Sequence, residues 1–196
     1  MVDPNRVAAF FDRLAPRWDA DMIRDDAVIG TILDNAQVRS GAHVLDVACG
    51  TGVLIPDYLA RNVASVTAID LSPEMARIAA DKFRDAKNVT VLCGDAAGRD
   101  YERRFDCIVV YNAFPHFADP ERLIEVLSAR LNPGGTLTVA HGMSREQINR
   151  HHTGITEAVA SDLMPAEELN AIFERYLTVT TVLSDARMYQ VAGKKE

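Results

Sequence analysis

The stretch that most constrains the fold of this chain is residues 44–52, which read Val-Leu-Asp-Val-Ala-Cys-Gly-Thr-Gly. Its aliphatic first half is typical of a short, buried parallel strand. The strand ends at Gly50 and Gly52, and apolar residues at helical spacing follow, namely Val53, Leu54, Tyr58 and Leu59. A strand that turns through glycines into a helix lets a ligand approach bare backbone at a helix N-terminus. We therefore expect a ligand site at this turn.

The residues around the turn favour one class of ligand. The dinucleotide fingerprint needs a third glycine at position 55, where Ile55 stands. Asp46, inside the strand end, would repel a pyrophosphate but could hold a cationic amine. The turn therefore indicates a zwitterionic nucleoside and disfavours a nicotinamide-dependent oxidoreductase.

Apolar runs and helical segments alternate through the middle of the chain. Ser72-Pro73-Glu74 and Asp119-Pro120-Glu121 each combine a capping residue, a proline and an acid, so each predicts the start of a helix. Asn132-Pro133-Gly134-Gly135 predicts a turn into the next strand. The apolar runs predict strands near residues 43–48, 65–70, 88–93, 105–111 and 136–141. This alternation predicts an α/β fold with a doubly wound, mostly parallel sheet.

The N-terminal residues predict two helices ahead of this sheet. The first presents an apolar face and ends before Pro16, with Val7, Phe10, Phe11 and Leu14 on that face. The second is expected over about residues 21–38 and carries Met22, Ile23, Ile29, Ile32 and Leu33. Having no strand partners, the first residues are candidates for a lid.

The C-terminal residues predict a helix near 165–174 and then two strands, 177–183 and 188–191. The link between the strands, residues 184–187, is too short for a crossover helix. The two strands should therefore form an antiparallel hairpin at the end of the sheet.

Length and composition limit the classes of function. A chain of 196 residues fits one domain, and its formal net charge of −7 disfavours a nucleic-acid partner. No apolar run is long enough to span a membrane, and the N-terminus lacks the features of a signal peptide. The three cysteines, Cys49, Cys93 and Cys107, read as free thiols, which favours the cytoplasm.

Five blocks of sequence match one known family in order and spacing. They are VLDVACGTG at 44–52, AIDLSPEM at 68–75, GDA at 94–96, FDCIVVYNAF at 105–114 and LNPGGTL at 131–137. Across roughly residues 40–140 the chain resembles a class I S-adenosylmethionine-dependent methyltransferase. The resemblance implies S-adenosyl-L-methionine as the cofactor and a seven-stranded, Rossmann-like sheet. FFDRLAPRWDA at 10–20 resembles the lid segment of quinone-biosynthesis methyltransferases, with Trp18 in place of the usual tyrosine.

The resemblance also implies roles for the residues around the cofactor. Asp70 would accept hydrogen bonds from the ribose hydroxyls, and Asp46 would reach the methionyl ammonium. Asp95 would accept from the adenine amine, while the Ala96 amide faces a ring nitrogen. The other expected contacts are Gly50 and Gly52 with the ribose and methionine portions, Leu71 and Met75 with adenine, Tyr111 and Asn112 with the methionyl end, and Trp18 from the lid.

The acceptor of the methyl group is less defined. The fourth predicted strand ends in Tyr-Asn-Ala-Phe and lacks the Asn-Pro-Pro-Tyr type of sequence that binds planar amide or exocyclic amine acceptors. The sequence therefore favours a small molecule methylated at oxygen, carbon or sulfur.

A histidine-rich segment, residues 141–152, is expected over the acceptor pocket. His141 and His152 are candidates for acid–base catalysis, because an unperturbed imidazole titrates near neutral pH. Contacts with the acceptor, including an anionic one, are expected from His116, Arg145, Asn149 and His151. A metal would need three convergent ligands among His141, His151 and His152, yet adjacent helical side chains diverge by about 100°. A metal site is therefore disfavoured.

These expectations divide the chain into a helical lid (1–40), a cofactor-binding core (41–141), an acceptor segment (142–164) and a C-terminal helix with hairpin (165–196). Methyl transfer to a small molecule is the favoured function. Two alternatives stay open: a non-catalytic cofactor-binding or regulatory protein, and a metal-dependent methyltransferase that uses the region of His141 and His152. The sequence does not determine the oligomeric state.

Overall fold

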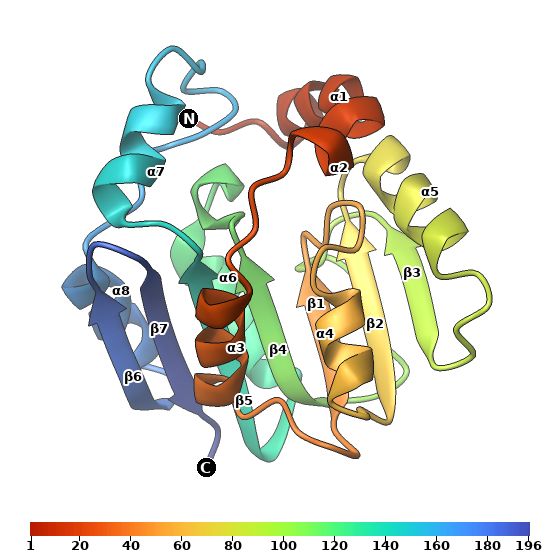
Figure 1. Ribbon diagram of the computed structural model, residues 1–196. Helices are drawn as coiled ribbons and strands as arrows, with labels where there is room; N and C mark the ends of the chain where they lie inside the picture. The colour runs from red at the N-terminus through yellow and green to blue at the C-terminus, as the bar shows by residue number, and fades with distance from the viewer.

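A seven-stranded sheet forms the centre of the computed structural model, which describes residues 1–196 (Figure 1). The strands are β1 (His43–Val47), β2 (Ser65–Asp70), β3 (Val89–Cys93), β4 (Phe105–Tyr111), β5 (Leu131–His141), β6 (Thr178–Ser184) and β7 (Tyr189–Lys194). Their order is β3-β2-β1-β4-β5-β7-β6. The first five strands pair in parallel, and β7 pairs antiparallel with both β5 and β6. The predicted sheet and its terminal hairpin are confirmed.

Helices cover both faces of the sheet (Figure 1). They are α1 (Pro4–Leu14), η1 (Ala15–Arg17), α2 (Trp18–Asp21), α3 (Asp26–Asn35), α4 (Ile55–Ala60), α5 (Pro73–Lys82), η2 (Phe114–His116), α6 (Pro120–Ala129), α7 (Arg145–His152) and α8 (Ala166–Phe173). Side chains of α3 and α4 form one buried cluster with β1 and β2, whereas α6 and α8 form a second cluster with β4, β5 and β7. The sheet is therefore buried between two layers.

The strand order reverses at β1, which lies between β2 and β4. In sheets of this kind, ligands bind beyond the carboxyl ends of the strands beside such a reversal. In Figure 1, α1 and α2 lie over this edge of the sheet, with α7 beside them. The topology therefore places the predicted lid and the acceptor segment at the expected ligand edge.

The second predicted helix is shorter than expected. It begins at Asp26 because the Asp25 side chain accepts hydrogen bonds from the amides of Ala27 and Val28. Ile23, expected on its apolar face, is 99% exposed. The helix itself is part of the core, since Gln190 of β7 donates to its Ile32 carbonyl. Of the lid expected over residues 1–40, only α1, η1 and α2 lie over the edge of the sheet.

The fifth strand begins earlier than predicted, at Leu131 rather than near residue 136. The expected turn at 132–135 is instead an irregular start of β5, where the pairing with β4 shifts register between Phe105 and Cys107. A side chain on Gly135 would lie 3.0 Å from three backbone carbonyl oxygens, so a larger residue would have to push these strands apart slightly.

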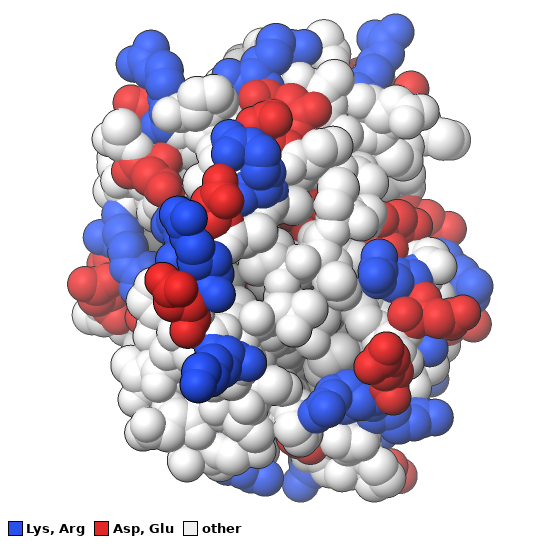
Figure 2. Space-filling model, turned by 90° about the vertical axis from the view of Figure 1, so that its right-hand side faces the viewer, with Lys and Arg blue, Asp and Glu red and all other residues white.

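Charges of both signs are mixed on the face of the molecule that carries α5, shown in Figure 2. Arg77 of α5, for example, pairs with both Glu74 and Asp81. No helix has the length and apolar character needed to cross a membrane.

Candidate functional site

Asp70 joins the two turns that form the predicted cofactor site. It ends β2, and its carboxylate accepts hydrogen bonds from the amides of Gly50 (2.7 Å) and Ser72 (2.9 Å). Burial is the largest influence on the carboxyl group and raises its pKa. Each carboxylate oxygen accepts one of these bonds and keeps lone-pair capacity for another donor. The group can therefore bind hydroxyls while it holds the turns together.

Asp46 is buried in β1 and is 2% exposed. Its Oδ2 atom has no hydrogen-bond partner. Burial raises the pKa of this carboxyl group to about 8, against the Tyr58 hydroxyl, which lowers it, and with the nearby charge of Asp70, which raises it further. A buried carboxylate without a partner is costly, and a cation beside it would favour its charged form. Asp46 Oδ2 therefore lacks a hydrogen-bond donor, and an ammonium group would supply one.

The two glycines of the turn after β1, Gly50 and Gly52, are required for different structural reasons. A side chain on Gly50 would point at the lid, 3.7 Å from Nε1 of Trp18. A side chain on Gly52 would lie 2.6 Å from the ring of Phe83, at the end of α5. Both residues have positive φ, +57° and +85°, in the region that favours glycine. Close packing explains Gly52, whereas Gly50 lies directly under the lid.

Asp95 and Ala96 follow β3 in a tight turn. The exposed Asp95 carboxylate accepts hydrogen bonds from the amides of Ala97 (3.0 Å) and Gly98 (3.1 Å), while Ala96 is buried. The Asp95 side chain therefore stabilises the turn in which it lies, and these hydrogen bonds fix the orientation of its remaining lone pairs.

The two residues predicted to contact adenine, Leu71 and Met75, lie just before α5 and in its first turn. Ser72 caps this helix by accepting from the Met75 amide at 3.1 Å. Met75 is 1% exposed and lies inside the fold, whereas Leu71 is half-buried beside Asp70. Of the pair, Leu71 has the more accessible side chain.

Tyr111 and Asn112 connect the end of β4 to the start of the acceptor segment. Asn112 has φ of +53°, and its Oδ1 accepts from the Gly142 amide at 2.9 Å. A side chain on Gly142 would lie 2.4 Å from the Tyr111 hydroxyl oxygen. Tyr111 and Asn112 therefore both contact Gly142, at the carboxyl end of the sheet.

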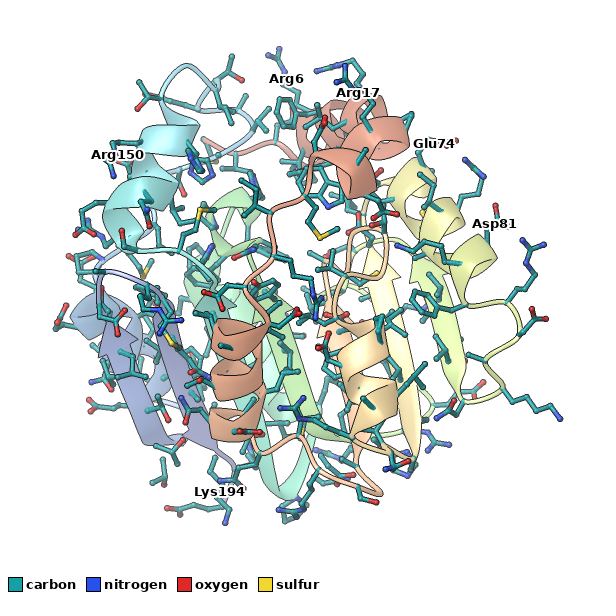
Figure 3. The ribbon with its side chains drawn as sticks, viewed as in Figure 1. Arg6, Arg17, Glu74, Asp81, Arg150 and Lys194 are labelled. Atoms are coloured by element: carbon teal, nitrogen blue, oxygen red, sulfur yellow. The ribbon has the colours of Figure 1, made fainter.

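Two carboxylates that sequence reasoning missed connect α1 and α2 to the turn after β1 and to α5. Asp12 of α1 accepts from Ser72 Oγ and from the Glu74 amide (3.1 Å) at the start of α5. Asp19 of α2 accepts from Thr51 Oγ1 and pairs with Lys82 at 2.9 Å. In the sequence FFDRLAPRWDA both aspartates lie next to an aromatic residue, and this position could have indicated them as functional residues. Arg6 and Arg17, labelled in Figure 3, extend outward from the same lid.

His141, the first predicted catalytic residue, is enclosed. It ends β5, is 1% exposed and packs edge-on against Tyr189 with ring centroids 6.0 Å apart. Neither ring nitrogen has a partner, nor does the Tyr189 hydroxyl. Burial lowers the pKa of His141 to about 3. The expectation that this imidazole titrates near neutral pH is wrong, because its charged form would lack solvation.

His116 and His152 lie face to edge, with ring centroids 5.4 Å apart. His116 belongs to η2, directly after β4, and His152 ends α7. Burial lowers the pKa of both, that of His116 to about 4. The structure thus brings the histidines that follow β4 and α7 together beneath the lid.

The predicted polar face of α7 contacts the following loop. Asn149 Oδ1 accepts from the Leu163 amide at 2.7 Å, and Arg145 Nε donates to the Leu163 carbonyl at 2.8 Å. His151 is exposed, and Arg150 beside it extends away from the lid in Figure 3. Arg145 and Asn149 therefore hold the loop at Leu163 in place, so the polar groups expected to bind an acceptor are engaged with the protein's own backbone. No group of three or more His, Cys, Asp or Glu side chains in the structure is arranged to hold a metal ion.

Comparison with known proteins identifies the family of the central part of the chain. Residues 44–135, from β1 into β5, match the family described as a methyltransferase domain. Residues 44–135 therefore belong to the class I S-adenosylmethionine-dependent methyltransferase family. The matched residues include Asp46, Gly50, Asp70 and Asp95.

Two similar proteins are named as methyltransferases. The chain is 29% identical over 143 residues to a ubiquinone biosynthesis O-methyltransferase of Coxiella burnetii, covering 69% of this chain and 61% of that protein. It is 31% identical over 140 residues to a malonyl-[acyl-carrier protein] O-methyltransferase of Acetivibrio thermocellus, covering 70% and 49%. The alignments thus span about half to three-fifths of those relatives.

A solved structure extends the likeness to nearly the whole fold. N-methyltransferase NodS from Bradyrhizobium japonicum WM9, in complex with S-adenosyl-L-homocysteine, superposes with a TM-score of 0.75 at 16% identity. The match covers 96% of this chain and 98% of NodS. The likeness shows a shared fold.

Proposed function

We propose that the chain binds S-adenosyl-L-methionine and transfers its methyl group to an oxygen, carbon or sulfur atom of a small molecule. The observation that carries this proposal is the pair of buried carboxylates around Gly50. Asp46 lacks a partner that a cationic amine would supply, and Asp70 has acceptor capacity for hydroxyls. A sulfonium nucleoside with an amino-acid tail has both groups.

The chain's residues fit the two ends of this cofactor. Asp70 would accept from the ribose hydroxyls, and Asp46 would pair with the methionyl ammonium. Asp95 and Ala96, in the turn after β3, would meet the adenine edge beside Leu71. When bound, the cofactor supplies an electrophilic methyl group on a positively charged sulfur.

The protein's main contribution would be positioning and exclusion of water, because methyl transfer from a sulfonium is an in-line displacement. Phe11 and Trp18 of the lid pack edge-on, with ring centroids 5.7 Å apart, above the Gly50 turn. The contacts of Asp12 and Asp19 would keep these rings over the reacting atoms. Lid closure would thus create a dry site.

A small-molecule acceptor is supported by the kinds of protein that resemble this chain. Two of them are named O-methyltransferases of ubiquinone biosynthesis and of a malonyl-[acyl-carrier protein]. The net charge of −7 disfavours a nucleic-acid acceptor. The free thiols of Cys49, Cys93 and Cys107 fit a reducing compartment, and we place the reaction in the cytoplasm.

Calorimetry and a turnover assay test this proposal separately. S-adenosyl-L-methionine and S-adenosyl-L-homocysteine should both bind at a single site. Turnover over a panel of phenols, aliphatic alcohols, thiols and carboxylic acids, followed by mass spectrometry, should yield a product heavier by one methyl group. Binding without any turnover would favour a non-catalytic cofactor-binding protein. Turnover that requires an added divalent metal would favour the metal-dependent alternative.

A further inference from the structure

A row of four aromatic rings leads from the glycine turn to the end of α7. Trp18 lies over Gly50, and Phe11 packs against Trp18 at 5.7 Å. Phe11 also packs edge-on against His116, with ring centroids 4.9 Å apart, and His116 contacts His152 at 5.4 Å. The row therefore connects the cofactor turn to an imidazole at the carboxyl end of β4.

The tautomer of His116 is fixed by one hydrogen bond. Its Nδ1 atom lies 2.9 Å from the carbonyl oxygen of Val159. A carbonyl oxygen only accepts, so Nδ1 carries the hydrogen and donates. In a neutral imidazole the other nitrogen, Nε2, then holds a lone pair and acts as an acceptor. The bond to Val159 is the only hydrogen bond of this ring, so Nε2 is free to accept a proton.

The loop that provides this carbonyl is itself held in place. Ser161 donates to the Pro115 carbonyl through its amide (2.9 Å) and its hydroxyl (3.2 Å), directly beside His116. Two residues further on, Leu163 is bound by Arg145 and Asn149. These contacts explain the polar face of α7, since it positions the loop that orients His116.

We propose that His116 Nε2 contacts the methyl acceptor and takes the proton of its hydroxyl or thiol as the methyl group arrives. This inference rests on the proposed function. The acceptor's oxygen or sulfur forms a bond to the methyl carbon, and the carbon–sulfur bond of the sulfonium breaks with its electron pair left on sulfur. The acceptor's proton moves to Nε2, so the positive charge lost by the sulfonium appears on the imidazole.

The surroundings of His116 indicate an acceptor that binds in its neutral form. The ring faces Phe11 from α1, the Val159 carbonyl and the His152 imidazole of α7. Burial lowers the pKa of both histidines. At neutral pH the cluster is uncharged, so it offers an anion no counter-charge. An un-ionised alcohol, phenol or thiol fits better than the anionic acceptor expected from the sequence.

His116 is also better placed than the two residues first predicted as catalytic. His141 is 1% exposed, whereas His116 is half-buried at the lid. His152 has a buried Nδ1 without a partner, so no contact fixes its tautomer through that atom. Of these three histidines, His116 is the one that is half-buried and also has a hydrogen bond that fixes its tautomer.

Nuclear magnetic resonance of the unliganded protein tests the tautomer without any turnover. Long-range ¹⁵N–¹H spectra at neutral pH, assigned with a His116→Asn variant, should show a protonated Nδ1 and an unprotonated Nε2. The opposite pattern, or a mixture of the two, would overturn the assignment.

Kinetics of the same variant test the proton transfer. His116→Asn can keep the donor to Val159 while it removes Nε2, and His43→Gln, at the opposite end of the sheet, is the matched control. For an alcohol or phenol that is neutral at the assay pH, His116→Asn should lower kcat about 100-fold or more, with unchanged cofactor affinity. The loss should shrink for acceptors that are already ionised and as pH rises, because these acceptors need no base.

A purely structural role would give the same loss for every acceptor, and that result would refute the inference. Equal rates in wild type and His116→Asn would also refute it. Absence of turnover in the wild-type protein with every acceptor would instead refute the proposed function, and the tautomer measurement would still stand.

Discussion

The amide of Gly50 donates a 2.7 Å hydrogen bond to the Asp70 carboxylate, so the turn after β1 and the end of β2 share one polar group. The same carboxylate accepts from Ser72 at the start of α5. Both oxygens are thereby oriented before any ligand binds. A site prepared in this way avoids reorganisation when hydroxyls arrive.

Replacing Asp70 should weaken both the cofactor site and the fold around it. Charge-assisted hydrogen bonds contribute about 1.5–3 kcal/mol each, so Asp70→Ala should reduce the affinity for S-adenosyl-L-homocysteine by at least about tenfold. Calorimetry measures the affinity, and thermal denaturation the accompanying loss of stability. Asp100→Asn, whose side chain is exposed, is the control and should leave both quantities unchanged. Unaltered affinity in Asp70→Ala would remove Asp70 from the site.

Cofactor binding should release a proton from Asp46. Its pKa is raised to about 8 in the unliganded protein, so the carboxyl is mostly protonated at pH 7. An ammonium beside it favours the charged form and lowers that pKa. Calorimetric titrations at pH 7 in buffers of different ionisation enthalpy should report release of up to about one proton. Asp46→Asn should bind more weakly and lose this contribution; identical heats for wild type in all buffers would contradict the prediction.

The two glycines of the turn should tolerate alanine differently. Both have positive φ, which costs a non-glycine residue about 1–2 kcal/mol. Gly52→Ala adds a methyl group 2.6 Å from the Phe83 ring and should lose about 1–3 kcal/mol more through overpacking. Gly50→Ala meets Trp18 only at an ordinary 3.7 Å.

Urea denaturation of the two variants measures this difference. Adding Phe83→Leu should restore part of the stability of Gly52→Ala, because it removes the clash. Equal stability of the two alanine variants would show that packing against Phe83 is not what requires Gly52.

The free energy of unfolding should fall as the solution is acidified, and His141 should account for part of this loss. The pKa of this buried imidazole is lowered to about 3, against an ordinary value near 6.5 in the unfolded chain. Between these values the unfolded state binds the extra proton, so the contribution is complete above pH 6.5. It declines by up to about 1.4 kcal/mol per pH unit below it.

The free energy of unfolding, measured by urea denaturation at pH 7.0, 6.0 and 5.0, checks this slope. His141→Gln cannot gain the proton, so its stability should depend less steeply on pH than that of the wild type over this range. Parallel curves for the two proteins would mean that His141 is solvated in the folded state.

Much of the fold follows from local sequence, because strand and helix periods, caps and glycine turns act over a few residues. Residues 44–52, the Ser72 cap and the short link at 184–187 were enough to predict the parallel sheet and its hairpin. Asp46 and Asp70 followed from their places at strand ends, where the topology brings side chains together. The start of α3 was misjudged because Asp25 caps the helix after Met22 and Ile23, which only looked like part of its apolar face.

The sequence by itself indicated the family, determined the sheet and placed Asp46 and Asp70 at neighbouring strand ends, since each depends on short-range patterns. Only the tertiary structure decided what surrounds each histidine. His141 is enclosed against Tyr189, 48 positions later in the chain, and His116 is oriented by Val159, 43 positions later. Burial and hydrogen-bond partners set the pKa and tautomer of an imidazole, and both arise from contacts between segments that no local pattern specifies.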